Sequence, residues 1–352
     1  MNLASNDYLG LSQHPKLIEA AIEATRRYGV GSGASRLISG TQPIHEQAEQ
    51  RFAAFKHAEA AMLLPTGYSA NLAVLTTLAG AGDLIVMDKL VHASLIDAAR
   101  ASGAETRTFP HLNLDRAAQL LERHATGRRF VVTDSVFSMD GDYADLSALC
   151  ELADRCDASL VIDDAHSTGI LGEDGSGLGE AVGVANRIYT CGSGGVVIST
   201  ASKALGSLGG IVTADRPVID LLVNKARPFI YSTAVPPAQA AAVIAALDTV
   251  RDEPQRRQDL ARHADHLLQS LAGRGWHIPP REHPTPIIPL VVGSEQAALD
   301  LANRLKDHGF FAPAIRPPTI APSSCRVRLS LRSDLTADDI ERLVQAIGDA
   351  PK

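Results

Sequence analysis

Short runs of apolar residues recur through the middle of the chain and indicate buried strands. Each run is continuous rather than alternating, which is typical of parallel strands covered on both faces of a sheet. The runs occupy residues 60–64, 83–87, 130–133, 159–162, 196–200 and 210–213. Segments with helical periodicity separate them, such as the one with Leu146, Leu149 and Leu152 on one face. The alternation predicts an α/β fold with a mainly parallel, doubly wound sheet.

The pattern changes after about residue 236, where long amphipathic helices dominate. An alanine-rich helix is expected over 236–250, and the next helix has Gly273 as a candidate C-terminal cap. Strand candidates follow at 287–292 and 327–331, and Thr336 is placed to cap the last helix. This part predicts a smaller α+β domain. We expect three regions: an N-terminal segment over 1–30, a large domain over 31–240 and a small domain over 241–352.

Composition narrows the class of protein. The chain has 352 residues, of which 45% are hydrophobic and 21% charged, as in soluble globular proteins. A net charge of -7 gives no general attraction to nucleic acid or to an anionic membrane. No apolar run is long enough to span a membrane, and the first residues lack the regions of a signal peptide. The four cysteines show no metal-ligand spacing, so we expect a cytoplasmic protein with reduced thiols and no bound metal.

Ionisable residues stand where two of the predicted strands end. Lys203 follows the run at 196–200 in a turn of small and hydroxyl residues, and Asp163 and His166 follow the run at 159–162. Ligands of doubly wound sheets bind beyond the carboxyl ends of the strands. A lysine beside a carboxylate suits a carbonyl cofactor held as a Schiff base, with the carboxylate keeping a ring nitrogen protonated. Each residue alone has an ordinary structural explanation; the combination favours a cofactor site.

Two strand-to-helix turns and one basic strand add candidates. The turn at Gly67 could hold a phosphate on backbone N–H groups, although glycine is common in such turns. His92 could stack on a cofactor ring or simply begin a helix. Arg326 and Arg328 share one face of a strand, with Arg316 and Arg332 nearby in the sequence. An arginine fork suits a carboxylate, and the alternative is an exposed basic strand face.

Together these motifs resemble those of the α-oxoamine synthases, pyridoxal-phosphate enzymes of fold type I, the aspartate-aminotransferase fold. The similarity covers nearly the whole chain, through segments 4–11, 31–36, 39–41, 92–94, 133–141, 163–169, 199–206 and 228–233. Segments 315–319 and 326–329 are most similar to members that condense L-alanine with a pimeloyl thioester in biotin synthesis. The alternatives are a sister activity that uses glycine and a short acyl-CoA, and a non-catalytic homologue that only binds pyridoxal phosphate.

The resemblance implies a role for each candidate residue near the cofactor ring. Lys203 would bind pyridoxal phosphate and move the α-proton of the substrate, and Asp163 would pair with the ring nitrogen. His92 would stack on the ring, while His166 and Ser138 would bond the phenolic oxygen.

The resemblance also implies a homodimer with a shared active site and two further groups of residues. The phosphate would be held by Gly67, Tyr68 and Thr200 of the same chain and by Thr233 of the partner subunit. The substrates, L-alanine and pimeloyl-CoA or a pimeloyl carrier protein, would be bound by Arg328, Arg316, Thr319 and Asn6.

Two departures from the family pattern affect these expectations. The family usually has an N-terminal leader before the motif at Asn6, which this sequence does not show. The interval between Asp163 and Lys203 is longer than usual and contains a glycine-rich stretch at 191–195. That stretch is expected to be either a surface insertion or an altered subunit contact.

Overall fold

The computed structural model describes residues 1–124, 126–279 and 281–351, which form two compact units. The larger unit comprises residues 11–137 and 143–252, and the smaller comprises 1–10, 138–142 and 253–352. The division near residue 252 falls at the end of helix α11 (Pro237–Asp252), which lies wholly in the larger unit, whereas the sequence suggested residue 240. Both units therefore combine stretches that are distant in the chain.

A seven-stranded sheet forms the centre of the larger unit, with strand order β1-β7-β6-β5-β4-β2-β3. Its strands are β1 (Ala60–Leu64), β2 (Leu84–Asp88), β3 (Glu105–Phe109), β4 (Arg129–Asp134), β5 (Ala158–Asp163), β6 (Gly195–Thr200) and β7 (Gly210–Ala214). Only β7 runs antiparallel to its neighbours among these strands. The predicted mainly parallel α/β sheet is confirmed.

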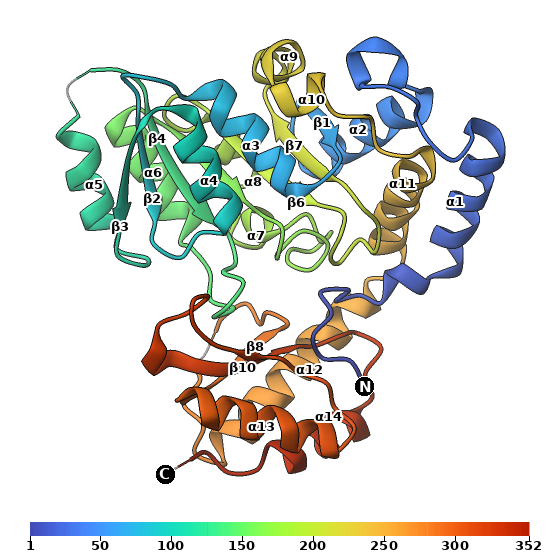
Figure 1. Ribbon diagram of the computed structural model, residues 1–352, viewed down its shortest axis with the longest axis vertical. Coiled ribbons are helices and arrows are strands. Elements are labelled where there is room, and N and C mark those ends of the chain that lie inside the picture. The colour runs from blue at the N-terminus through green and yellow to red at the C-terminus, as the bar shows by residue number, and fades with distance from the viewer. Residues whose placement is uncertain (125, 280, 352) are drawn as a thin grey trace. The chain divides into compact units, whose positions relative to one another are not determined.

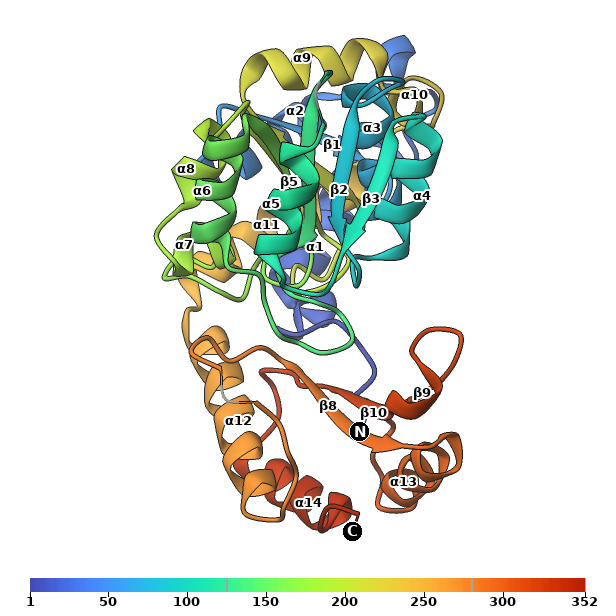
Figure 2. The same ribbon diagram turned by 90° about the vertical axis from the view of Figure 1, so that its left-hand side faces the viewer.

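Helices cover both faces of this sheet, which explains the continuous apolar strands (Figure 1). They are α1 (Pro15–Tyr28), α2 (Pro43–Phe55), α3 (Gly67–Leu78), α4 (Ala93–Ser102), α5 (Leu114–Glu122), α6 (Leu146–Cys156), α7 (Leu178–Ala181), α8 (Ala185–Thr190), α9 (Arg216–Lys225), α10 (Arg227–Ile230) and α11. Figure 2 shows α3 and α4 on one side of the sheet and α6 and α8 on the other. Val132, Ile198 and Val212 of the strands pack in the core with Leu75 of α3.

Strand β3, at the edge of the sheet, was not predicted from the sequence. It pairs only with β2, and four of its five side chains are exposed or half-exposed polar groups. An edge strand needs no continuous apolar run, since one of its sides meets solvent. The pattern of apolar residues therefore gave no signal for it.

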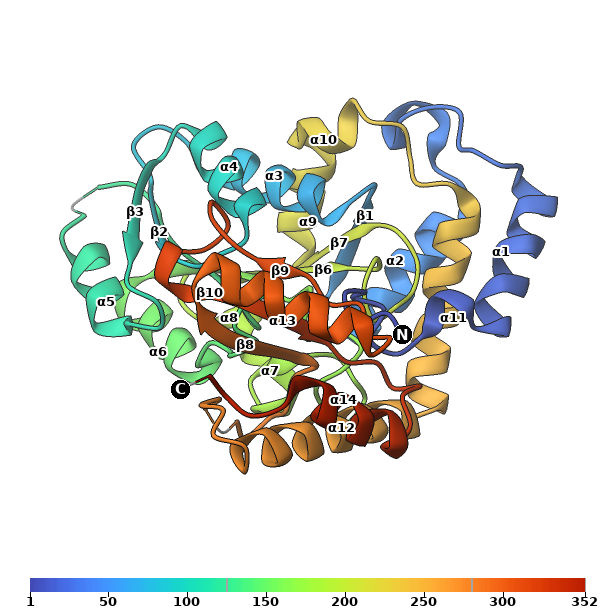
Figure 3. The same cartoon turned by 60° about the horizontal axis from the view of Figure 1, so that its bottom comes forward.

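The smaller unit contains a three-stranded sheet with order β8-β10-β9 and three long helices. Its elements are α12 (Gln255–Ala272), β8 (Ile287–Gly293), α13 (Glu295–Asp307), β9 (Ala314–Ile315), β10 (Cys325–Ser330) and α14 (Ala337–Ile347). Helices α12 and α14 lie side by side (Figure 3). Thr336 caps α14 as predicted, because its side chain accepts a hydrogen bond from Asp339 N. Gly273 is the C-cap of α12 as predicted: its φ is -62°, and its N–H donates to Gln269 O over 3.2 Å.

The glycine-rich stretch before β6 is a tightly packed turn. The N–H of Gly192 donates to Asp154 Oδ1 over 2.7 Å, and Leu160 N donates to Gly194 O. A Cβ on Gly192 would lie 2.2 Å from Ala158 O, and one on Gly195 would lie 2.0 Å from Ile188 O. Only glycine fits at these two positions, so the turn packs against α6 and β5 and is no loose surface loop.

None of the helices in the described residues is long and apolar enough to cross a membrane.

Candidate active site

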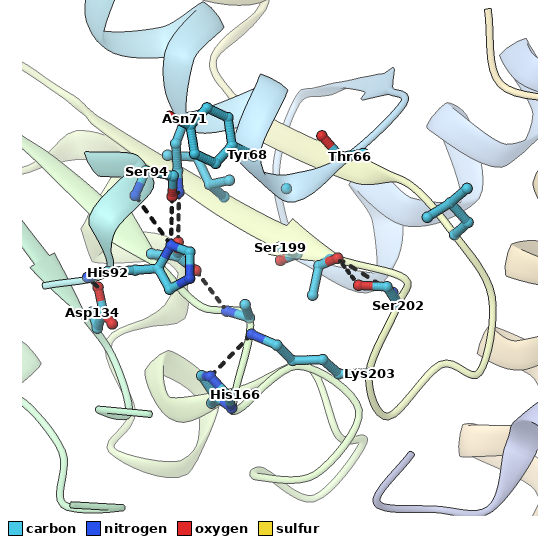
Figure 4. A pocket seen from close by; sticks show the side chains of 16 residues that line it. Thr66, Tyr68, Asn71, His92, Ser94, Asp134, His166, Ser199, Ser202 and Lys203 are labelled. Carbon is cyan, nitrogen blue, oxygen red and sulfur yellow. Dashed lines mark hydrogen bonds between the residues drawn. The ribbon is translucent and has the colours of Figure 1, made fainter. Parts of the chain in front are cut away.

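A pocket of about 250 Å³ opens in the larger unit where β4, β5 and β6 end and where α3 and α4 begin. The sequence analysis had proposed seven of its lining residues: Gly67, Tyr68, His92, Asp163, His166, Thr200 and Lys203. These residues come from four separate turns, which the parallel strands bring to one edge of the sheet. Figure 4 shows several of them around the same opening.

Asp163 is held in place by two donors at the base of this pocket. Its Oδ2 accepts a hydrogen bond of 2.7 Å from Asn71 Nδ2, and its Oδ1 accepts one of 3.1 Å from Ala165 N. Asn71 lies one helical turn after Gly67 in α3, and its other amide hydrogen goes to Ser94 Oγ. The carboxylate therefore has a fixed orientation before any ligand binds.

A second carboxyl, Asp134, lies beside Asp163 on the neighbouring strand. The two residues are partners in the parallel register of β4 and β5, and both line the pocket. Complete burial and the nearby Asp163 raise the pKa of Asp134 well above its ordinary value, while a hydrogen bond from His92 N opposes the rise. The raised pKa of Asp134 disfavours a second negative charge beside Asp163.

Lys203 and His166 meet at the mouth of the pocket. Lys203 Nζ lies 3.0 Å from His166 Nε2, and Figure 4 shows the two side chains pointing toward one another. Each residue sits in a turn directly after a strand, Lys203 after β6 and His166 after β5. The contact therefore joins two arms of the site that are far apart in sequence.

His92 stands at the N-cap of α4 and faces the same pocket. Its Nδ1 lies 2.7 Å from Ser94 Oγ and accepts a hydrogen bond from Ser94 N. Burial lowers the pKa of His92, the charge of Lys203 adds to this, and Asp163 opposes it. Its imidazole is therefore neutral at physiological pH and suits an aromatic stacking contact.

The start of α3 forms a cradle for an anion. Thr66 caps the helix by accepting from Ser69 N over 3.0 Å. Within the described ranges, the N–H groups of Gly67 and Tyr68 bond to no protein acceptor. Thr200 and Ser202 also line the pocket, and their hydroxyl oxygens lie 2.8 Å apart. Thr200 lies close to Gly67, because a Cβ on Gly67 would be 3.5 Å from Thr200 Cβ. Two amides at a helix N-terminus and two hydroxyls are the donors that a phosphate group requires.

Three other candidates gather within the smaller unit around Arg328. The guanidinium is buried and donates from Nε to Ser138 O over 2.5 Å and from Nη2 to Asn6 Oδ1 over 3.2 Å. Its Nη1 donates to Ser330 Oγ, and Tyr8 Oη lies 3.4 Å from Nη2. Burial raises the pKa of Tyr8 to about 12, although the charge of Arg328 opposes this. Arg328, Ser138 and Asn6 thus form one polar cluster.

The remaining candidates are not among the residues that line the pocket or bond to the Arg328 guanidinium. Arg316 and Thr319 belong to an exposed segment after β9, where Arg316 Nη1 is 3.9 Å from Glu295 Oε2. Thr233 forms an isolated bridge with Ser35 in the larger unit and is not among the residues that line the pocket. The structure of the single chain therefore gives these three residues no place in the pocket.

Among the residues of these clusters, the sequence analysis gave no role to Tyr8, Asn71, Ser94, Asp134 and Ser202. Asn71 could have been found, because its spacing of four from Gly67 puts both on one face of a helix. Asp134 ends a predicted strand, as Asp163 does, which is a similar signal. Tyr8, Ser94 and Ser202 lie in segments that carry the family resemblance, and their individual contacts become visible only in the structure.

Comparison with known proteins identifies the family. The profile of the family "Aminotransferase class I and II" matches residues 1–347. The chain belongs to this family. Among family relatives, the 8-amino-7-oxononanoate synthase of Geotalea daltonii is 44% identical over 349 residues, covering 98% of this chain and 87% of that protein.

Two solved structures extend the comparison. A serine palmitoyltransferase from S. paucimobilis with PLP and myriocin bound is 28% identical, with a TM-score of 0.93 over 99% of this chain and 86% of that one. The 8-amino-7-oxononanoate synthase of Francisella tularensis is 27% identical, with a TM-score of 0.85 over 99% of this chain and 96% of that one. The predicted fold type and the resemblance to α-oxoamine synthases are confirmed.

Proposed function

We propose that this chain is a pyridoxal-phosphate-dependent acyltransferase that makes 8-amino-7-oxononanoate for biotin synthesis. It condenses L-alanine with a pimeloyl thioester and releases carbon dioxide and the free thiol carrier, which is coenzyme A or a carrier protein. The observation that carries this proposal is the 44% identity to an 8-amino-7-oxononanoate synthase over 98% of the chain.

Pyridoxal phosphate fits the residues of the pocket. The free amides of Gly67 and Tyr68, together with Thr200, suit its phosphate, and Asp163 suits its ring nitrogen. When bound to the amino acid, the cofactor withdraws electrons from the α-carbon and so stabilises a carbanion there. The fixed carboxylate of Asp163 keeps the proton on the ring nitrogen, because an opposite charge nearby favours the charged form.

Lys203 and His166 handle protons in this proposal. The imidazole lies 3.0 Å from Lys203 Nζ and orients the amine toward the pocket. A neutral Lys203 takes the α-proton of the amino acid and later returns a proton to the product. His166 also donates toward the phenolic oxygen of the cofactor, and Ser138 supports it from the same side. The neutral ring of His92 stacks on the cofactor without adding a positive charge.

Arg328 binds the carboxylate of L-alanine. Its guanidinium is buried and is oriented by Ser138 O and Ser330 Oγ, so little side-chain entropy remains to be lost on binding. Asn6 lies on the same guanidinium and helps to orient it. Arg316 and Thr319 contact the acyl substrate from the exposed segment after β9. Their exposure suits a long acyl carrier that approaches from solvent.

We further propose that the enzyme is a cytoplasmic homodimer in which Thr233 of the partner subunit reaches the phosphate. The support is a set of exposed apolar side chains that lie close in sequence to the bridged residues Ser35 and Thr233. Val30, Ile38 and Tyr231 are 82%, 79% and 71% exposed in the single chain. Large apolar side chains gathered on one surface are typical of a protein–protein interface. Light scattering after gel filtration should give the mass of two chains.

A substrate panel tests the activity. The purified protein, loaded with pyridoxal phosphate, is given L-alanine, glycine or L-serine with pimeloyl-, acetyl- or succinyl-CoA or with a pimeloyl carrier protein. Mass spectrometry of the products should show 8-amino-7-oxononanoate from L-alanine and one or both pimeloyl donors. Condensation with glycine alone would favour the sister activity. Binding of the cofactor with no condensation of any amino acid would favour a non-catalytic homologue.

A further inference from the structure

A buried ion pair lies behind the turn that carries Asp163 and His166. Lys56, directly after α2, places its Nζ 2.6 Å from Asp164 Oδ2, and the two side chains are only 5% and 4% exposed. The same ammonium donates to Thr168 Oγ1 over 2.8 Å and to the backbone oxygen of Ser176. All three of its hydrogens thus have acceptors, which a fully buried lysine requires. Neither Lys56 nor Asp164 lines the pocket.

Asp164 spreads this contact over the whole turn after β5. It accepts hydrogen bonds from Ser167 Oγ and Thr168 Oγ1, and its N–H donates to Ile198 O over 2.6 Å. Thr168 Oγ1 also lies 3.0 Å from Ser199 Oγ in β6. The network therefore ties the turn after β5 to the end of β6.

That connection joins the two arms of the proposed active site. The first arm carries Asp163, immediately before Asp164, and His166, which lies between the anchored residues Asp164 and Ser167. The second arm carries Thr200 and Lys203, which follow Ser199 at the end of β6. A shift of the turn would change the position of His166 relative to Lys203.

Gly177 lies directly against the ion pair of Lys56 and Asp164. Gly177 has a φ of +126°, and a Cβ at this position would lie 2.3 Å from Asp164 Oδ2 and 3.0 Å from Lys56 Nζ. Gly183 nearby also has a positive φ, of +75°, but a Cβ there would meet no atom within 4 Å. Both glycines have a positive φ, and of the two only Gly177 lies against the ion pair.

We propose that the pair of Lys56 and Asp164 is a positioning device for the cofactor site. It fixes the turn so that Asp163 meets the ring nitrogen and His166 meets Lys203. It also neutralises Asp164, which would otherwise put a second buried charge next to Asp163. Only the turnover measurement below rests on the proposed function, because affinity for pyridoxal phosphate is measured independently of the acyl substrates.

The first test compares Lys56→Met with Leu121→Ala. Leu121 is fully buried in α5 and takes no part in the network, so its truncation reports general destabilisation. At a temperature where circular dichroism shows both variants folded, Lys56→Met should lower the affinity for pyridoxal phosphate and kcat, each by about ten-fold or more, because small displacements of reacting groups are costly. The KM for L-alanine should change little. Leu121→Ala should match the wild type in all three quantities.

The second test compares Gly177→Ala with Gly183→Ala. Gly177→Ala should reproduce the loss of cofactor affinity, whereas Gly183→Ala should cost stability alone. Thr168→Val, which removes one acceptor of Lys56, should lower the affinity for pyridoxal phosphate by a smaller factor. If Lys56→Met does not fold, Gly177→Ala, Gly183→Ala and Thr168→Val test the proposal instead.

Equal affinity for pyridoxal phosphate in Gly177→Ala and Gly183→Ala would overturn the proposal. A folded Lys56→Met variant with wild-type cofactor affinity and kcat would also overturn it. If the wild type binds pyridoxal phosphate but forms no product, the proposed function fails while the affinity comparison still stands.

Discussion

Asn71 offers a quantitative test of how the protein holds Asp163. Its side-chain amide is buried and donates to Asp163 Oδ2 and to Ser94 Oγ, each over 2.7 Å. Replacement by leucine keeps a similar volume but removes both donors. A hydrogen bond to a charged acceptor contributes about 1.5–3 kcal/mol and one to a neutral hydroxyl about 1 kcal/mol. Asn71→Leu should therefore lower the free energy of unfolding of the cofactor-free protein by about 2.5–4 kcal/mol.

The comparison variant is Ser94→Ala, which removes the neutral partner of this amide and the hydroxyl next to His92 Nδ1 but leaves the bond to Asp163 in place. It should cost about 1–2 kcal/mol, less than Asn71→Leu, because both lost contacts are to neutral groups. Urea unfolding followed by circular dichroism measures both values. The affinity for pyridoxal phosphate should fall in Asn71→Leu, because Asp163 loses one of its two fixed donors. Equal destabilisation by both variants, with unchanged cofactor affinity in Asn71→Leu, would refute this account of the site.

Three further predictions concern charge. Asp163→Asn should lower kcat by about two orders of magnitude or more while the protein stays folded, because the ring nitrogen loses its counter-charge; steady-state kinetics and thermal melts check this. Burial lowers the pKa of His92, so His92 binds a proton more readily in the unfolded chain than in the folded one as the pH falls below about 6.5. The free energy of unfolding should therefore decrease below that pH. A His92→Phe variant should show a weaker decrease in thermal melts recorded at several pH values. Arg328→Lys should raise the KM for L-alanine by about ten-fold or more with little change in cofactor affinity, because the bidentate fork is lost.

The sequence was informative where chemistry coincides with the ends of strands. Continuous apolar runs located the parallel strands, and Asp163, His166 and Lys203 follow two of them directly. The carboxyl ends of parallel strands lie at one edge of the sheet. Residues that follow different strands in the sequence, such as Asp163 and Lys203, could therefore be predicted to lie close together. The edge strand β3 lacked an apolar run and was missed for that reason.

Other parts of the site depend on tertiary contacts that no local pattern records. Ser138 lies between two stretches of the larger unit in sequence, yet it belongs to the smaller unit with Arg328. Lys56 lies 108 positions from Asp164, and nothing in its own surroundings marks it as buried. Thr233 was assigned through the family resemblance alone, and its proposed role requires a second subunit. Such residues become apparent only when the fold has been determined.

The most direct test of the central claim follows the fate of L-alanine at Lys203. Protein loaded with pyridoxal phosphate is incubated with isotopically labelled L-alanine and a pimeloyl thioester, and the products are identified by mass. The account predicts labelled 8-amino-7-oxononanoate and carbon dioxide from the wild type and none from a folded Lys203→Ala variant. The same product from Lys203→Ala, or no product from a wild type that has bound the cofactor, would contradict it.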